Sequence, residues 1–106
     1  MIVEALVPDA RRPGSTRVLV NGRPAWTVPA DVIAGLRLEV GSVLRGEAIE
    51  HLDRAAEVEG AFRAALRALE RRAHGARELA FKLERKGHSA GAIAPAIDRL
   101  QALGLL

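Results

Sequence analysis

Short apolar runs separated by turn residues fill the first thirty positions of the chain. The run "IVEALVP" predicts a strand that stops at Pro8, and "DARRPGS" follows as a turn-rich loop. In "RVLVNGRPAWTVP", two apolar runs flank Asn21-Gly22, a residue pair that tolerates the positive φ angles of a type I′ turn. The sequence therefore predicts a β-hairpin. Pro24 places its second strand at a sheet edge, because proline lacks the backbone N–H.

The pattern changes between residues 28 and 50. "VPADVIAGLRLEVGSVLRG" predicts a short helix, which Pro29 can open and Gly35 or Gly41 can close, followed by an extended stretch. Around "RGEAIEH" the composition shifts to Ala, Glu, Arg and Leu, which are strong helix formers for the most part. We place a module boundary there, which gives a β-hairpin module with a short helix over residues 1–46 and a helical module over residues 47–106.

Hydrophobic positions three and four residues apart predict three helices in the second module. The first covers residues 47–73, where Gly60 costs about 1 kcal/mol relative to alanine and marks a site for a bend. The second ends at Gly87, and the third begins after the cap Ser89 and closes at Gly104. The expected inward positions are Ile49, Leu52, Ala56, Phe62, Leu66, Leu69, Ala73, Leu79, Leu83, Ile93, Ile97, Leu100 and Leu103.

These elements predict an α+β fold, in which a small amino-terminal β-hairpin module precedes a three-helix repeat and the chain is mainly α. Hydrophobic residues at 49% and charged residues at 27% are typical of a globular protein and exclude a disordered chain. The aromatic residues are only Trp26, Phe62 and Phe81, so the core must be built from small and aliphatic side chains. We expect marginal stability. Trp26 either anchors the thin sheet or is an exposed contact, and we favour the core position because the rest of the core is small.

The 106 residues include no cysteine, which excludes disulfides and thiolate metal sites and fits an intracellular setting. The start "MIVEALVPDARRPG" lacks the basic region and long apolar run of a signal peptide. No stretch reaches the roughly 18 apolar residues that a membrane span needs. We therefore expect a cytoplasmic protein without a membrane partner.

Charge is distributed unevenly along the chain. All of the formal net charge of +3 lies after residue 50, because the first fifty residues carry six arginines and six acidic residues. Between Arg63 and Lys86, eight basic residues accompany three glutamates. This excess of positive charge indicates a polyanion or an acidic protein as partner. The alternative is a solvated helix surface with no partner.

The sequence offers little catalytic chemistry. The histidines His51, His74 and His88 are too scattered for a local metal motif, and we expect surface or helix-end roles for them. The carboxylate pairs 47/50 and 57/59 are expected at solvated helix positions, without the apolar pocket that would separate their pKa values. No serine has the context of a nucleophile, and "GSVLRG" does not match a phosphate-binding loop. We expect neither an enzyme nor a bound metal or cofactor.

The segment "ALRALERRAHGARELAFKLERKGHSAGAIAPAIDRLQALGLL" resembles the first helical repeat of the RecX family, bacterial regulators of the RecA recombinase. In the first module, "VLVNGRPAWTVP" and "GLRLEVGSVL" are similar to the hairpin and the following segment of many members. Pro95 falls where the third helix of members is normally uninterrupted, and it predicts a kink in the first turns. The matching residues of the repeat are Ala65, Leu66, Leu69, Arg77, Glu78, Leu79, Lys82, Leu83, Lys86, Gly87, Ile93, Ile97, Leu100, Leu103, Gly104, Leu105 and Leu106.

The resemblance implies a regulator that acts by binding. Members of the family are similar to a curved array of three-helix repeats that lies along the groove of the RecA filament and hinders its growth or activity. On this reading the closing "LGLL" is the end of a first repeat, so the chain is either truncated or a short member. The implied partner is the RecA filament, with weak non-specific DNA contact in addition, and the chain is expected to be a monomer.

Six basic residues are the candidates for contact with the filament or with DNA: Arg71, Arg72, Arg77, Lys82, Arg85 and Lys86. Their alternative roles are compensation of helix dipoles and solubility. Two further functions remain open. One is a helix-turn-helix-like nucleic-acid-binding module, although the third helix has only Asp98 and Arg99 as charged residues. The other is a helical scaffold without a partner of its own.

Overall fold

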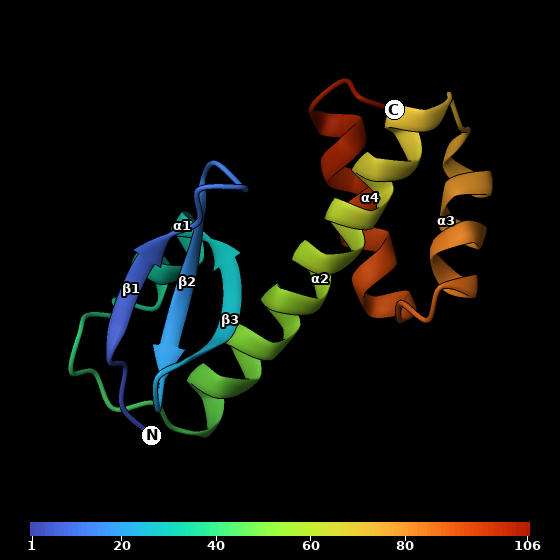
Figure 1. Cartoon of the computed structure of the whole chain (residues 1–106). Helices are drawn as coiled ribbons and strands as arrows, with labels where there is room; N and C mark the ends of the chain where they lie inside the picture. Colours follow the sequence, from blue (N-terminus) through green and yellow to red (C-terminus); the bar gives the residue numbers. More distant parts are fainter. The chain divides into compact units, whose positions relative to one another are not determined.

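A computed structural model describes all residues from Met1 to Leu106 and divides them into two compact units (Figure 1). The amino-terminal unit is Met1–Ala56 and the carboxy-terminal unit is Glu57–Leu106. The boundary falls inside helix α2 (Gly46–Arg71), ten residues after the composition shift at residue 46. The first turns of α2 belong to the amino-terminal unit because Leu52 is buried in that unit's core.

The amino-terminal unit is built on an antiparallel sheet of three strands in the order β1-β2-β3. The strands are β1 (Ala5–Pro8), β2 (Ser15–Val20) and β3 (Arg23–Pro29). Asn21 and Gly22 have φ angles of 53° and 75°, and Val20 pairs with Arg23 across the turn. The predicted type I′ hairpin is therefore confirmed, because both central residues of that turn need positive φ.

One face of this sheet packs on the core, together with α1 (Ala30–Gly35) and the start of α2. Trp26 is 9% exposed, and its Nε1 donates a hydrogen bond of 2.7 Å to Oδ1 of Asp53, so the ring anchors the sheet to α2 as predicted. The prediction of an extended stretch after α1 is wrong. Residues 36–45 form turns, with a single bridge between Ile2 and Val43. The positive φ of Gly41 helps to bend this segment.

The carboxy-terminal unit is a three-helix bundle made of the second part of α2, α3 (Ala76–Arg85) and α4 (Ala90–Ala102). Figure 1 shows α3 running antiparallel to both of the other helices. Many of the buried residues are alanines, which lets the helix backbones approach closely. The fully or nearly fully buried residues are Ala61, Phe62, Ala64, Ala65, Ala68, Leu79, Leu83, Ala92, Ile93, Ala96, Ile97 and Leu100.

Most of the expected inward positions of these helices are buried or partly buried, but two are exposed. Ala73 lies beyond the end of α2, and Leu103 is 57% exposed. Leu103 is the residue that follows the last turn of α4, so its side chain has left the buried face. Helix α2 continues through Gly60, and α4 remains one helix from Ala90 to Ala102 with Pro95 inside it. Pro95 is exposed, so the carbonyl that it leaves unbonded is near solvent.

No helix is both long and apolar enough to cross a lipid bilayer.

The turn between α3 and α4 uses the predicted residues. Gly75 precedes α3 as its N-cap, and Gly87 ends α3 with a φ of 97°. Ser89 caps α4, because its Oγ accepts a hydrogen bond of 3.2 Å from the backbone N–H of Ala92. Each of these residues acts through its own backbone conformation or a hydrogen bond to a near neighbour. The helix ends could therefore be predicted from the sequence.

Replacing Gly87 by valine is expected to lower the free energy of unfolding by about 1 kcal/mol or more. A Cβ at Gly87 would meet no atom within 4 Å, so the cost comes from the positive φ alone. Gly91 is the matched control, because it is helical and exposed, and Gly91→Ala should leave stability unchanged or increase it by up to about 1 kcal/mol. Urea unfolding of both variants measures the difference. A Gly87→Val protein as stable as the parent would contradict the left-handed turn.

Candidate partner-binding surface

The candidate surface follows one face of α3. Glu78, Lys82 and Arg85 are spaced four and three residues apart, so they lie above one another on this helix. Arg72, which follows the end of α2, lies beside them. Together with Phe81 and Lys86 these residues line a hollow of 460 Å³. Its four cations and one carboxylate leave a formal net charge of +3 (four minus one) at this face of α3.

An ion pair fixes one end of this hollow. The guanidinium of Arg72 donates two hydrogen bonds to the carboxylate of Glu78 and a third, of 3.0 Å, to the backbone carbonyl of Ala73. The hydrogen bond from Arg72 lowers the pKa of Glu78, and the same bond raises the pKa of Arg72. Both side chains are about half exposed, so the pair contributes more to the orientation of Arg72 than to stability.

Phe81 is a surface residue that sequence reasoning missed. Its side chain is 61% exposed, and it lines two hollows, the basic one and an apolar groove of 630 Å³ between α3 and α4. The guanidinium carbon of Arg85 lies 6.0 Å from the ring centroid, at the outer limit of a cation–π contact. The signal was present in the sequence, because Phe81 lies two residues from both Leu79 and Leu83 and therefore faces away from the buried stripe.

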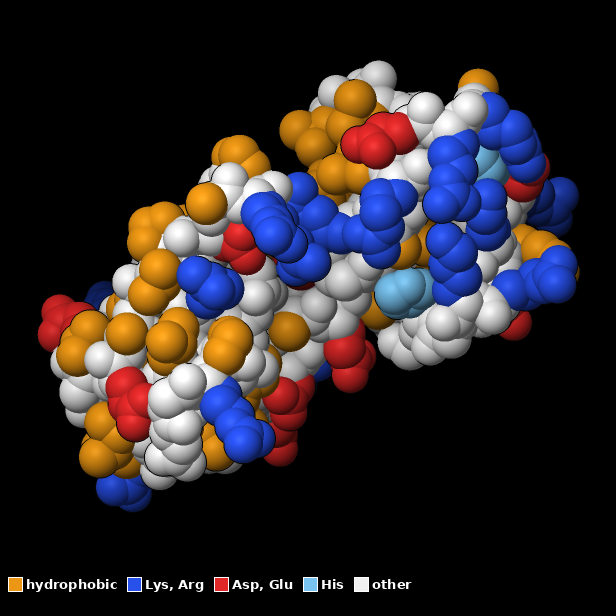
Figure 2. Space-filling model, viewed as in Figure 1, with side chains coloured by type: hydrophobic (Ala, Val, Ile, Leu, Met, Phe, Trp, Pro, Cys, Tyr) orange, Lys and Arg blue, Asp and Glu red, His pale blue; other side chains and the backbone are white.

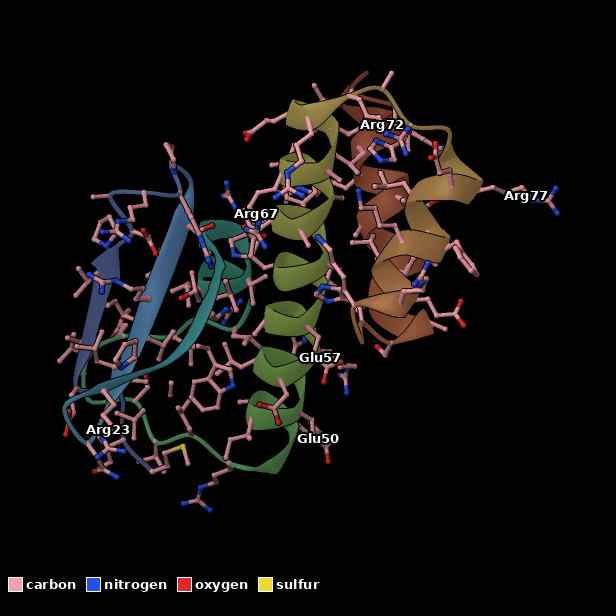
Figure 3. All side chains as sticks on the ribbon, turned by 45° about the vertical axis from the view of Figure 1, so that its right-hand side comes forward. Arg23, Glu50, Glu57, Arg67, Arg72 and Arg77 are labelled. Atoms are coloured by element: carbon pink, nitrogen blue, oxygen red, sulfur yellow. The ribbon has the colours of Figure 1, made fainter.

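The structure brings together four of the six predicted site residues. Arg72, Lys82, Arg85 and Lys86 share the basic hollow, whereas Arg77 lines the apolar groove on the other side of Phe81. Figure 2 shows Lys and Arg side chains gathered over this bundle, and in Figure 3 Arg77 points away from it.

The sixth residue, Arg71, is exposed as the last residue of α2 and lines neither hollow. The two glycine-containing turns lie at opposite ends of α3, so what joins the cations is the helix face rather than a turn.

The expectation that both carboxylates of the pair 57/59 are solvated is wrong for Glu59. Its side chain is only 1% exposed and accepts hydrogen bonds of 2.9 Å from Arg63 and 2.9 Å from Arg99. The guanidinium of Arg99 also stacks 3.8 Å above the ring centroid of Phe62. The spacing of four residues from Glu59 to Arg63 is the signal that sequence reasoning could have used. Glu57 is exposed as expected.

The histidines do not form a site. His74, between α2 and α3, is 8% exposed, and its Nδ1 donates a hydrogen bond of 2.9 Å to the carbonyl of Arg72. It therefore has the expected helix-end position but is buried. His51 is exposed, His88 is half-buried, and no group of three or more His, Cys, Asp or Glu side chains is placed to hold a metal ion.

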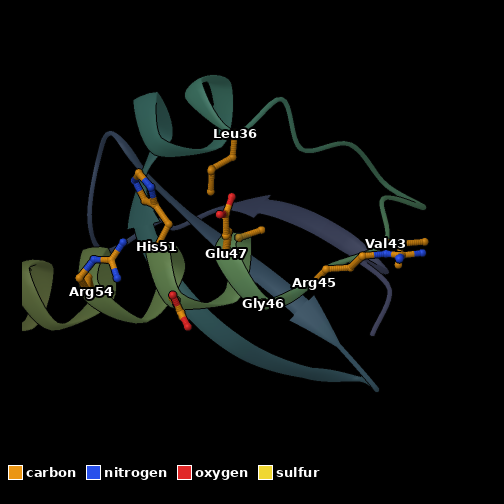
Figure 4. Close-up of a pocket in the computed structure, with 9 residues that line it drawn as sticks. Leu36, Val43, Arg45, Gly46, Glu47, His51 and Arg54 are labelled. Atoms are coloured by element: carbon orange, nitrogen blue, oxygen red, sulfur yellow. The ribbon is translucent and has the colours of Figure 1, made fainter.

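A further hollow, of 810 Å³, opens at the start of α2 in the amino-terminal unit. Figure 4 shows Leu36 and Glu47 pointing toward one another across it, with His51 and Arg54 on the next turn of α2. The carboxylates of Glu47 and Glu50 balance the guanidiniums of Arg45 and Arg54, so this hollow favours neither anions nor cations.

Comparisons with known proteins bear on the carboxy-terminal unit. The family model described as "RecX, first three-helix domain" matches residues 61–100. This range, called the RecX domain, is similar to the first three-helix domain of the RecX family. The resemblance to the RecX family is thus confirmed, and the matched range contains Phe81 and every candidate basic residue.

A solved structure, "Crystal structure of regulatory protein RecX", matches the chain with a TM-score of 0.75 over 99% of its length, at 19% sequence identity. This likeness confirms the α+β fold, including the hairpin module that precedes the RecX domain. The chain spans about half of the solved RecX protein, 51% of its length. No curated protein matches.

Proposed function

We propose that the chain binds the RecA filament and inhibits its activity through the RecX domain. The basic hollow and the exposed ring of Phe81 at its edge make the contact. The chain is a regulator that acts by binding, in recombination and DNA repair. No catalytic constellation is required for this role, because occupying a filament groove is enough to obstruct it.

The observation that carries the proposal is the arrangement of cations around Phe81. Arg72, Lys82, Arg85 and Lys86 line one hollow with the ring, and none of the last three forms a salt bridge. Unpaired cations attract an acidic surface at long range, and an exposed aromatic ring supplies apolar area that becomes buried on contact. Arginines and aromatic rings are also enriched among the residues that dominate binding energy.

The helix-turn-helix alternative gains no support from α4, the helix that would enter the major groove. Arg99 is its only basic residue, and its guanidinium is held by Glu59 and stacked on Phe62. Asp98 is exposed on the same helix and would repel phosphates. Gln101 is the one exposed amide of this helix, so α4 has little with which to read base edges. Weak, sequence-independent contact with DNA phosphates through the basic hollow is compatible with the main proposal.

The experiment compares a RecA filament on single-stranded DNA with the same DNA alone. We expect the chain to bind the filament more tightly than either single-stranded or duplex DNA, and to reduce RecA-driven ATP hydrolysis as its concentration rises. A protein with three such repeats should be far more potent, because linked modules gain from effective concentration. Equal binding to filament and to naked DNA, without an effect on hydrolysis, would favour the nucleic-acid-binding alternative.

A further inference from the structure

The outer face of the sheet, opposite the core, carries an arginine at its centre. Arg17 on β2 pairs with Val7 on β1 and with Thr27 on β3, so these three residues form one row across the sheet. The neighbouring row contains Val18 and Trp26, which are buried in the core. Since side chains alternate between the two faces of a strand, Arg17 and Thr27 project from the outer face.

The loop between β1 and β2 folds back beside this row. The backbone N–H of Asp9 donates to the carbonyl of Ser15 (2.9 Å), and the N–H of Ser15 donates to the carbonyl of Arg12 (3.0 Å). The N–H of Arg11 donates to Oδ1 of Asp9 (2.9 Å). These bonds give the loop a defined path. As a result, six residues line one hollow of 430 Å³: Asp9, Ala10, Arg11, Arg12, Arg17 and Thr27.

The three arginines of this hollow have no anionic partner. None of them forms a salt bridge, and the nearby carboxylate of Asp9 accepts a backbone N–H instead. The Nε of Arg17 is buried without a hydrogen-bond partner. A buried donor of this kind is costly to leave unpaired, because it has lost its hydrogen bonds to water. The hollow has a formal net charge of +2, from three arginines and one aspartate.

We propose that this hollow binds a phosphate group. A guanidinium offers parallel N–H donors that match two oxygens of a phosphate, and the unpaired Nε–H of Arg17 is one such donor. Arg11 and Arg12 add charge from the loop, and Thr27, the strand partner of Arg17, is a further lining residue. The phosphate is either a free phosphate ion or a phosphodiester of a nucleic-acid strand. Both present the same oxygens to the arginines.

This site is independent of the proposed function. All of its residues lie in the amino-terminal unit, and the residues assigned to filament binding lie in the RecX domain. The composition of the loop, "DARRPGS", gave a turn prediction but no site, because Arg17 comes from a strand and its unpaired Nε is visible only in the structure.

The test follows the arginine Nε–Hε resonances of the full chain by NMR. One arm titrates sodium phosphate at constant ionic strength, and the second titrates a single-stranded oligothymidylate. We expect saturable shifts for Arg17, Arg11 and Arg12, while the exposed Arg23 and Arg37 of the same unit do not move. Saturation in the phosphate arm alone identifies a free phosphate ligand, and tighter saturation by the oligonucleotide identifies a phosphodiester.

Replacing Arg17 by lysine distinguishes the effect of hydrogen-bond geometry on phosphate binding from the effect of charge. Arg17→Lys keeps the charge but removes the Nε donor, so phosphate affinity should fall about tenfold. Arg23→Lys, at the exposed hairpin turn, should bind like the parent. The resonances of the unmodified chain keep the proposal testable if Arg17→Lys does not fold. No saturable shift of Arg17 in either arm, or equal shifts of all arginines, would overturn it.

Discussion

Replacing four of the six candidate basic residues together by alanine is expected to weaken association with a RecA–DNA filament about 30-fold at low salt. The estimate assigns about 0.5 kcal/mol to each exposed charge, or about 2 kcal/mol in total. The loss should shrink as salt rises, because the Debye length falls from about 10 Å at 0.1 M to about 3 Å at 1 M. The residues to be replaced are Arg71, Arg72, Arg85 and Lys86.

The matched control removes the same charge from the amino-terminal unit. Its four replaced residues are all exposed: Arg23, Arg37, Arg45 and Arg54. Both variants have the same net charge, so a general loss of electrostatic attraction would weaken them equally. Filament binding measured at two salt concentrations distinguishes the two cases. Full affinity of the first variant, or equal losses in both, would contradict a role of the candidate basic residues in binding.

The largest expected effect on stability comes from Glu59. Glu59→Ala should lower the free energy of unfolding by about 2 kcal/mol, because it leaves Arg63 and Arg99 without their shared carboxylate. Breaking a fully buried ion pair costs about 3–5 kcal/mol. The smaller estimate applies here because the two arginine side chains are 19% and 40% exposed and can regain water.

Two further substitutions test whether the loss of stability in Glu59→Ala comes from the lost carboxylate. Glu59→Gln keeps an oxygen that can accept one hydrogen bond and should lose about 1 kcal/mol. Glu57→Ala, at an exposed position two residues away, should change stability by less than about 0.5 kcal/mol. A Glu59→Ala protein no less stable than Glu57→Ala would show that the pair contributes nothing.

The two compact units call for separate probes of unfolding. The single tryptophan, Trp26, is buried in the amino-terminal unit, so its fluorescence reports that unit. Far-ultraviolet circular dichroism reports mainly the helices. The Glu59→Ala transition should therefore move to lower urea when followed by circular dichroism. Coincident shifts in both probes would indicate that the two units unfold together.

Local features of this protein could be predicted from the amino-acid sequence alone. Asn21-Gly22, Gly87 and Ser89 specify a turn, a helix stop and a cap, because each depends on the φ angle or hydrogen bond of one or two residues. The stripe of Leu79 and Leu83 was equally readable, since a helix that packs on one side must repeat its apolar positions every three to four residues. The family resemblance rested on the order of these signals.

Which polar residues are buried, and which cations lie side by side, depends on how the helices pack. Glu59 looks like any helix-surface glutamate until α4 brings Arg99 to it from forty residues away. In the same way, Arg72 joins Lys82 because α3 packs antiparallel beside the end of α2. The physical reason is that a charge can be buried only when a partner compensates for its lost water. Such partners are supplied by packing, whereas turns and helix ends are fixed by their own few residues.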